Sequence, residues 1–202
     1  MMGKVFKIFR KEGGLLRALG LWEWYKALHP KEQKVVKYYF SLKCIKSLKF
    51  PYKPKDLESG EVFTLYTDKT FLGMLAQTAL LENALGDAEW LYLEALKMGG
   101  KALETHMILN DLVILAQKQK SYDKMERYSK ADVELFPEYE EKLRELNNGI
   151  LPPLNSFYIY LYILERKWEI KKAWDLLSYM EERGIPFYDE TKRRIEKKLF
   201  ST

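Results

Sequence analysis

Cysteine and histidine are nearly absent from this sequence of 202 residues, which holds one cysteine, Cys44, and two histidines, His29 and His106. A single cysteine excludes a disulfide within the chain and agrees with a reducing compartment. One cysteine and two histidines do not supply a zinc site of the usual spacing, and the sequence has no EF-hand loop for calcium. We therefore expect neither a metal nor a cofactor.

Long apolar runs are also missing. The longest stretch without a charged residue, 146–164, contains Pro152 and Pro153, so its apolar part begins only at Leu154. That part is shorter than the roughly 20 apolar residues that a membrane span needs. Lys7 and Arg10 interrupt the apolar start of the chain, which makes it a poor signal peptide. We expect a soluble, cytoplasmic protein.

The sequence also lacks the common catalytic motifs. The sequence contains no Gly-Lys-Ser/Thr phosphate loop and no Gly-x-Ser-x-Gly nucleophile turn. Cys44 and His29 can be imagined as a nucleophile and its base, but a lone cysteine is far more often a buried core residue. The glutamates between 138 and 145 alternate with Lys142 and Arg144, which is typical of an ion-paired surface. We predict that the protein is not an enzyme.

The composition that is present indicates a folded helical protein. Hydrophobic residues make up 47%, charged residues 31% and aromatic residues 14% of the chain, a balance that can build a sizeable core. Apolar residues recur at helical spacing, whereas 31–48 also tolerates a strand. Prolines and a Ser-Gly pair make 51–61 the predicted linker between a helical segment, 1–60, and a second domain, 61–202. The predicted helices are 15–28, 31–48, 69–85, 86–97, 102–118, 121–135, 137–146, 155–166, 168–183 and 189–200.

Charge divides the chain unevenly. Residues 1–55 carry 14 Lys/Arg and 3 Asp/Glu, a net charge of +11, whereas residues 56–202 carry 20 and 26, a net charge of −6. A basic segment of this kind suits nucleic acid, anionic lipid or an acidic protein. Its lysines scatter around the helical wheel, which favours a solvated surface over one phosphate-binding face. The candidate basic patch is Lys31, Lys34, Lys37, Lys43, Lys46 and Lys49.

The first residues combine basic and apolar side chains. Val5, Phe6, Ile8 and Phe9 alternate in pairs with lysines and an arginine. A segment of this composition can lie on a membrane surface, but it more often packs its apolar side on the body of the protein. A membrane partner is therefore not favoured.

An internal repeat follows residue 68. Gly86-Asp87-Ala88-Glu89 overlays Lys120-Ser121-Tyr122-Asp123 at an offset of 34 residues, the tetratricopeptide period. The second repeat ends in Glu134-Leu-Phe-Pro137, and residues 173–186 are similar to the second helix and exit of a pentatricopeptide repeat. Residues 68–202 thus resemble the tetratricopeptide/pentatricopeptide superfamily, although the Trp, Gly and Tyr of the consensus first helix are largely missing. The first 60 residues match no family.

The resemblance implies an all-α fold in which antiparallel helix pairs stack as a right-handed α-solenoid. The first helix of each pair then lines a concave face that binds peptides. Tyr158 and Tyr162 are equally well explained as core residues. Ile159 falls at the position that reads a base in pentatricopeptide proteins, and an apolar side chain cannot hydrogen-bond a base. The candidate concave residues are Asn83, Asn110, Gln117, Asn155, Tyr158, Tyr162 and Glu165.

We predict from the sequence a non-enzymatic scaffold that binds a peptide or partner protein. The alternative is a nucleic-acid-associated protein that uses the basic N-terminal segment.

Overall fold

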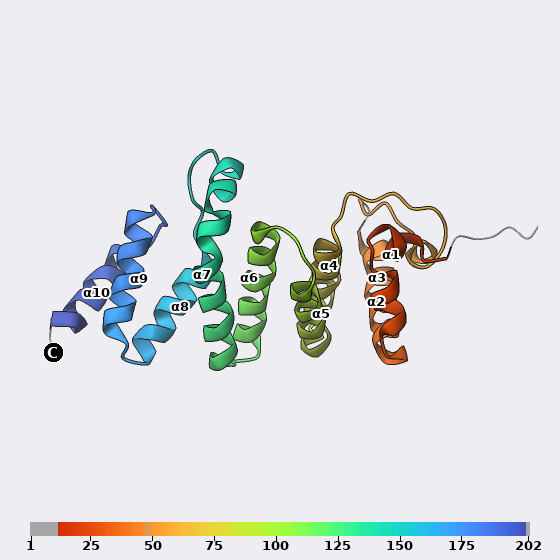
Figure 1. The fold of residues 1–202 in the computed structure, drawn as a ribbon. Coiled ribbons are helices and arrows are strands. Elements are labelled where there is room, and N and C mark those ends of the chain that lie inside the picture. The colour runs from red at the N-terminus through yellow and green to blue at the C-terminus, as the bar shows by residue number, and fades with distance from the viewer. Residues whose placement is uncertain (1–11, 48, 201–202) are drawn as a thin grey trace, which may run out of the picture. The chain divides into compact units, whose positions relative to one another are not determined.

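The computed structural model describes residues 12–47 and 49–200, and this part of the chain forms ten α-helices, one 3₁₀-helix and no strand (Figure 1). It divides into two compact units, 1–99 and 100–202. The all-helical prediction is confirmed. The elements of the first unit are α1 (Gly14–Ala18), α2 (Trp22–Ala27), α3 (Pro30–Lys46), η1 (Pro54–Leu57), α4 (Asp68–Leu81) and α5 (Leu85–Lys97). Those of the second are α6 (Ala102–Lys118), α7 (Tyr122–Leu146), α8 (Asn155–Arg166), α9 (Ile170–Glu182) and α10 (Asp189–Phe200).

The first unit begins with two short helices where the sequence predicts one helix over 15–28. That prediction is wrong because Gly20 adopts a left-handed conformation (φ 74°) and separates α1 from α2. His29 then caps α3 with its side chain, and Pro30 opens the helix. Helix α3 ends at Lys46, and the predicted end, residue 48, lies outside the described residues.

Gly14 brings the start of the chain against the segment that was predicted to be a linker. A Cβ atom on Gly14 would lie 2.3 Å from the backbone oxygen of Asp56, so only glycine permits this approach. Gly13 donates a backbone hydrogen bond to Glu58 (2.7 Å), and Leu57 in η1 is buried. The predicted domain boundary near residue 60 therefore falls inside the first compact unit.

Aromatic rings form much of the first unit's interior. The ring of Phe40 on α3 lies 5.7 Å from that of Phe50 and 6.0 Å from that of Phe71 on α4. Phe40 and Phe71 are fully buried, so they join α3 to α4 through apolar contact. Thr67 caps α4 with its side chain.

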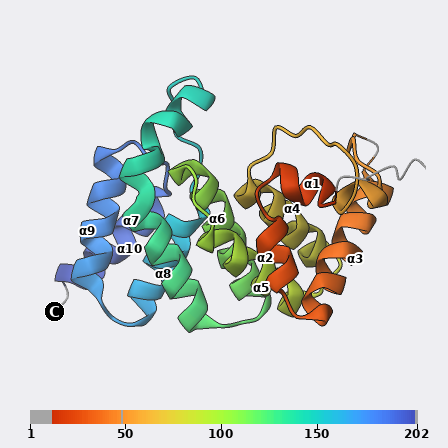
Figure 2. The ribbon, with the colours of Figure 1, turned by 45° about the vertical axis from the view of Figure 1, so that its right-hand side comes forward.

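Three helix pairs share one turn geometry, as can be followed in Figure 2 for α6 and α7. A non-glycine residue with left-handed φ ends the first helix of each pair: Asn83 (59°), Lys120 (56°) and Trp168 (58°). In each turn this residue donates to the carbonyl three residues earlier, and the next residue donates to the carbonyl five before itself, at 3.0–3.1 Å. This is the Schellman pattern that satisfies the last carbonyls of a helix.

The common turn corrects the sequence overlay. Asn83, not Gly86, is equivalent to Lys120, so the first two turns are 120 − 83 = 37 residues apart. The overlay at 34 residues is therefore wrong by three. Glycine normally marks the left-handed position after a helix, but Gly86 lies inside α5 and an asparagine takes that position.

Burial follows the same register. The residues five, eight, nine and twelve positions after each turn residue are buried in the second helix of all three pairs. These positions are one face of a helix and pack against the first helix of the pair. They are Ala88, Leu91, Tyr92 and Ala95 in α5; Met125, Tyr128, Ser129 and Asp132 in α7; and Ala173, Leu176, Leu177 and Met180 in α9.

Helix α7 is continuous across Pro137, although the sequence predicts a break there. Pro137 is exposed, while Phe136 and Tyr139 beside it are buried in the core of the second unit. Burial of these aromatic side chains offsets the cost of a proline within a helix. The pattern read as a closing proline is therefore interior to a helix of 25 residues.

The second unit closes with α9 and α10. Ile195 of α10 is fully buried and belongs to the same core as Phe157 of α8 and Leu177 of α9. The predicted helices 102–118, 155–166 and 189–200 are confirmed at both ends.

Candidate functional site

The predicted concave residues are divided between the two compact units. Asn83 lies in the left-handed turn after α4, in the first unit. Asn110 and Gln117 lie on α6, where Asn110 is half-buried and Gln117 is exposed. Asn155 begins α8. What the structure does bring together is the exposed side of α8, which carries the remaining three candidates.

The chain itself occupies two of these candidates. The hydroxyl of Tyr158 donates to the backbone oxygen of Pro186, and burial raises its pKa. The carboxylate of Glu165 accepts two hydrogen bonds from Arg194 (3.0 and 2.7 Å) and one from Lys198 (3.2 Å), both on α10. Tyr158 and Glu165 thus hold the C-terminal segment against α8.

Tyr162 remains on the surface, with 44% of the residue exposed, so its core assignment is wrong. It borders a pocket of about 350 Å³ lined by Tyr162, Glu165, Arg166, Arg194 and Lys198. We call these five residues, with the adjacent Tyr122 and Trp168, the α8–α10 cluster.

Two tyrosines fix the guanidinium of Arg166. Arg166 donates to the hydroxyls of Tyr122 (3.1 Å) and Tyr162 (3.2 Å) and lies over the ring of Tyr122, 4.5 Å from its centre. The hydrogen bond from Arg166 lowers the pKa of Tyr162, and the same bond raises that of Arg166. A planar cation held in this way keeps donors for a carboxylate or another anionic group.

Trp168 is the most exposed aromatic residue of the cluster, at 73%, and stands at the left-handed position of the α8–α9 turn. Lys198 lies over its ring at 5.6 Å. A bulky residue in this conformation is a genuine outlier, and such strain gathers at functional sites. Exposed Trp, Tyr and Arg side chains are also the residues that dominate protein interfaces.

The α8–α10 cluster has a positive net charge. It carries three cations, Arg166, Arg194 and Lys198, and one carboxylate, Glu165, a net charge of 3 − 1 = +2. Partial burial works to raise the pKa of Glu165, but the hydrogen bonds from Arg194 and Lys198 outweigh it and place that pKa below its usual value. The carboxylate therefore stays ionised, and the remaining positive charge suits an acidic ligand.

A second polar group lies inside the same unit. Nδ1 of His106 lies 2.8 and 2.9 Å from the two oxygens of Asp132, which is fully buried. The imidazole stacks on the ring of Tyr139 at 4.3 Å, and burial together with Asp132 raises the pKa of that tyrosine. No sequence pattern points to Asp132, whose equivalents in the other pairs are the apolar Ala95 and Met180.

The imagined nucleophile and base are not neighbours. His29 caps the start of α3 and Cys44 lies near its end, which separates them by roughly 20 Å along the helix axis. Burial and the charge of Asp56 raise the pKa of Cys44 to about 11, so its thiol is protonated at neutral pH. Among the described residues no three His, Cys, Asp or Glu side chains gather in an arrangement that suits a metal ion.

The basic patch is dispersed. Five of its lysines lie on α3, where at about 100° per residue they spread over more than half of the circumference, and Lys49 lies beyond the end of that helix. Lys37 pairs with Glu58 at 3.0 Å, and Lys46 pairs with Glu82. Lys31, Lys34 and Lys49 are exposed, and Lys43 is half-buried. The amphipathic start of the chain, 1–11, lies outside the described residues. No helix in the described part of the chain is long and apolar enough to cross a bilayer.

Comparison with known proteins finds a protein of Aquifex aeolicus (strain VF5), described as an uncharacterized protein, that is 55% identical over 202 residues. The match covers 98% of this chain and the whole of that protein. No protein-family model matches the chain, and no solved structure matches it.

Proposed function

We propose that this chain, which belongs to the same family as the Aquifex aeolicus protein, is a non-enzymatic cytoplasmic scaffold that binds an acidic segment of a partner protein. The α8–α10 cluster is the binding surface. The helix pairs of the chain stack as a right-handed α-solenoid of the tetratricopeptide type. Support for the repeat comes from the three turns with one hydrogen-bond pattern and from the shared register of buried positions.

The observation that carries the proposal is Trp168. The chain places its largest side chain, 73% exposed, at a position where a glycine is the favoured residue. Lys198 covers one face of the ring, but the left-handed conformation costs about 1–2 kcal/mol for a residue with a side chain, and most of the tryptophan stays exposed. Contact with a partner supplies the missing reason, since a tryptophan buries a large apolar area when it is covered.

Arg166 supplies the second element of recognition. Its guanidinium is oriented by Tyr122 and Tyr162 before any ligand arrives, which reduces the ordering cost of binding. An aspartate or glutamate of the partner is the matching group, because a carboxylate accepts two parallel hydrogen bonds from arginine. Lys198 and Arg194 add positive charge beside it and increase the rate of encounter with an acidic chain.

Affinity capture with matched variants tests the proposal. Tagged wild-type protein, an Arg166→Ala/Trp168→Ala variant and a Lys34→Ala/Tyr38→Ala control are each incubated with native lysate, with and without nuclease. The control removes another exposed cation and aromatic residue, on α3 of the first unit. We expect one set of proteins to be lost with the first variant only, with its affinity weakened on the order of 30-fold.

A different result of the same experiment would contradict the proposal. Recovery of nucleic acid, with proteins that disappear after nuclease treatment or with the α3 control, would overturn the scaffold in favour of the basic segment. Peptides from the captured partner then provide a direct measurement, because an acidic ligand must bind more weakly as salt concentration rises.

A substitution by glycine separates binding from folding. We expect Trp168→Gly to raise the free energy of unfolding by up to about 1 kcal/mol, because glycine adopts the left-handed turn without strain. Lys120→Gly, at the equivalent turn, should stabilise by a similar amount. Only Trp168→Gly should lose the partner, and retention of full affinity by that variant would contradict the assigned surface.

A further inference from the structure

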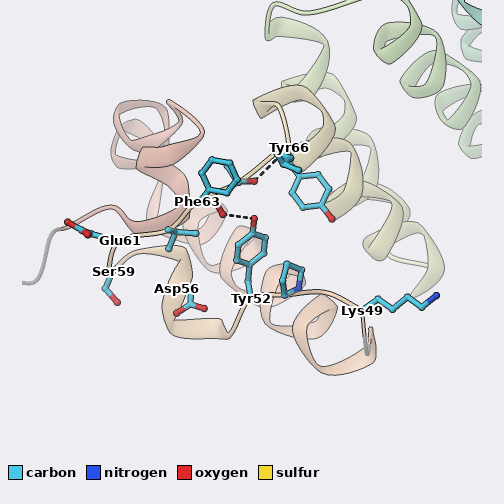
Figure 3. Close-up of a pocket in the computed structure, with 12 residues that line it drawn as sticks. Lys49, Tyr52, Asp56, Ser59, Glu61, Phe63 and Tyr66 are labelled. Atoms are coloured by element: carbon cyan, nitrogen blue, oxygen red, sulfur yellow. Dashed lines mark hydrogen bonds between the residues drawn. The ribbon is translucent and has the colours of Figure 1, made fainter.

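Two hollows on the described part of the chain differ in charge. The first, of about 630 Å³, lies in the first unit, and its aromatic lining includes Tyr52 and Tyr66 (Figure 3). Lys49 lines it together with the carboxylates of Asp56 and Glu61, a net charge of 1 − 2 = −1. The second is the pocket of about 350 Å³ in the α8–α10 cluster, where the net charge is +2. Of the two, the second has the sign that attracts an anion.

The positive pocket is built from two helices. Tyr162 and Arg166 stand four residues apart on α8, and Arg194 and Lys198 stand four residues apart on α10. Side chains at this spacing share one face of a helix, so each helix contributes one face to the pocket. Glu165 of α8 joins the two faces, because its carboxylate accepts hydrogen bonds from Arg194 and Lys198. The three cations are thus held around one hollow before a ligand arrives.

The guanidinium of Arg166 keeps one pair of donors free. Its Nη1 donates to the hydroxyls of Tyr122 and Tyr162, which uses both hydrogens of that nitrogen. Within the described part of the chain, Nε and Nη2 of Arg166 bond to no residue. These two nitrogens present parallel N–H groups, the geometry that binds two oxygens of a carboxylate or a phosphate.

The two cations of α10 also keep donors. Lys198 gives Glu165 one hydrogen bond, and an ammonium group carries three hydrogens. Arg194 uses Nε and Nη2 to bond Glu165, which leaves its Nη1. The pocket therefore combines donors from three cations with a surplus of two positive charges. A carboxylate has one charge and two oxygens, so it would compensate only half of this surplus.

We propose that the pocket binds the phosphoryl group of a phosphorylated side chain in the acidic segment of the partner. Such a group carries a charge of about −1.5 to −2 at neutral pH and three strong acceptor oxygens. Two of its oxygens accept from Nε and Nη2 of Arg166, and the third accepts from Lys198. Trp168 lies beside Lys198 and packs against the residues that flank the phosphorylated one. This inference rests on the proposed function, because it names the group that the same surface recognises.

Matched peptides test the inference on the full chain. The peptides share one sequence of alanine and aspartate and differ at the centre, which is phosphoserine, phosphotyrosine, glutamate or serine. Isothermal titration calorimetry at constant ionic strength measures each affinity, with inorganic phosphate and a single-stranded oligonucleotide as further probes. We expect a phosphorylated peptide to bind at least about tenfold more tightly than the glutamate peptide, because it adds charge and a third acceptor.

Three variants show whether the pocket is responsible. Arg166→Ala and Arg193→Ala each remove one positive charge, but Arg193 is exposed on α10 and does not line the pocket. We expect only Arg166→Ala to weaken the phosphorylated peptide, on the order of tenfold. Arg166→Lys keeps the charge and loses the parallel N–H groups, so it should abolish the preference for phosphate over glutamate while both peptides still bind.

The outcomes separate this inference from the proposed function. Equal affinity for the phosphorylated and glutamate peptides would overturn the phosphoryl site and leave the acidic scaffold intact. Failure of every peptide to bind, with capture from lysate unchanged by Arg166→Ala/Trp168→Ala, would refute both. Tighter binding of the oligonucleotide would assign the pocket to nucleic acid, and equally tight binding of inorganic phosphate would assign it to the free ion.

Phosphatase treatment provides a second measurement. Native lysate is treated with phosphatase, or with heat-inactivated phosphatase as the control, before affinity capture with the wild-type chain. We expect the proteins that depend on Arg166 and Trp168 to be lost after active phosphatase only. Their undiminished capture from treated lysate would contradict the phosphoryl site, although the scaffold would still stand.

Discussion

The buried pair of His106 and Asp132 offers a quantitative test of how the second unit is held together. Asp132 has no exposed surface, and both of its oxygens lie within 2.9 Å of the imidazole. His106→Leu would leave this carboxylate buried without its partner. Removal of one member of a buried polar pair typically costs about 3–5 kcal/mol, because the remaining group keeps its desolvation penalty.

A double variant should recover most of that loss. The chain itself shows which apolar residues fit: Leu154 stands fourteen residues before Trp168, as His106 does before Lys120, and Ala95 is equivalent to Asp132. His106→Leu/Asp132→Ala nearly conserves the total side-chain volume, which cores tolerate well. We expect its free energy of unfolding to lie within about 1–2 kcal/mol of wild type, and above that of His106→Leu.

Urea unfolding followed by circular dichroism measures all three variants, with Asp132→Ala completing the cycle. The coupling between the two positions should then be at least ~2 kcal/mol. Additive losses, with the double variant the least stable, would refute the reasoning. They would show that His106 contributes through its stacking on Tyr139 and not through the carboxylate.

Three further outcomes follow from the structure. Against the effect of partial burial, the hydrogen bonds from Arg194 and Lys198 hold the pKa of Glu165 below its usual value, so the stability they contribute is lost as pH falls below the unfolded value of about 4.3. The amides of α10 should then lose protection from hydrogen exchange as the solution is acidified, and Glu165→Gln should abolish this pH dependence. Gly14→Ala should break the contact between α1 and the backbone of Asp56 and lower the free energy of unfolding by about 3 kcal/mol or more. Gly20→Ala is the control, because its Cβ meets open space and incurs only backbone strain. Pro137→Ala should stabilise the chain by up to about 3 kcal/mol, because alanine restores a hydrogen bond within α7. We expect this gain to appear as a higher melting temperature.

Helix positions were predictable where local signals agree with packing. Helix α6 is bounded as expected because Gly99-Gly100 precedes it and an apolar stripe runs along its whole length. The break at Gly20 and the continuity at Pro137 were not predictable from local signals. Gly20 ends a helix that its neighbours would continue, and Pro137 is retained because the aromatic residues around it are anchored in the core.

The candidate site was predictable only in part. Tyr162 was singled out from its place on the first helix of the third pair, and it does border the pocket. Arg194 and Lys198 come from α10, 29 and 33 residues beyond Glu165, so no local pattern joins them to it. Trp168 carries a signal that was visible in retrospect: an aromatic residue between the charged Lys167 and Glu169, at the end of a helix.

The contact of Gly14 with Asp56 also has a consequence for the order of events during synthesis. The backbone that residues 13 and 14 pack against is made more than 40 residues after them. Until then α1 lacks its contact with η1, and a helix of 5 residues does not persist alone. The helix pairs of the second unit each find their partner within one short turn, so they can form as they emerge. Helix α1 thus reaches its packed state only after η1 has been made, whereas each helix pair of the second unit can fold once both of its helices have emerged.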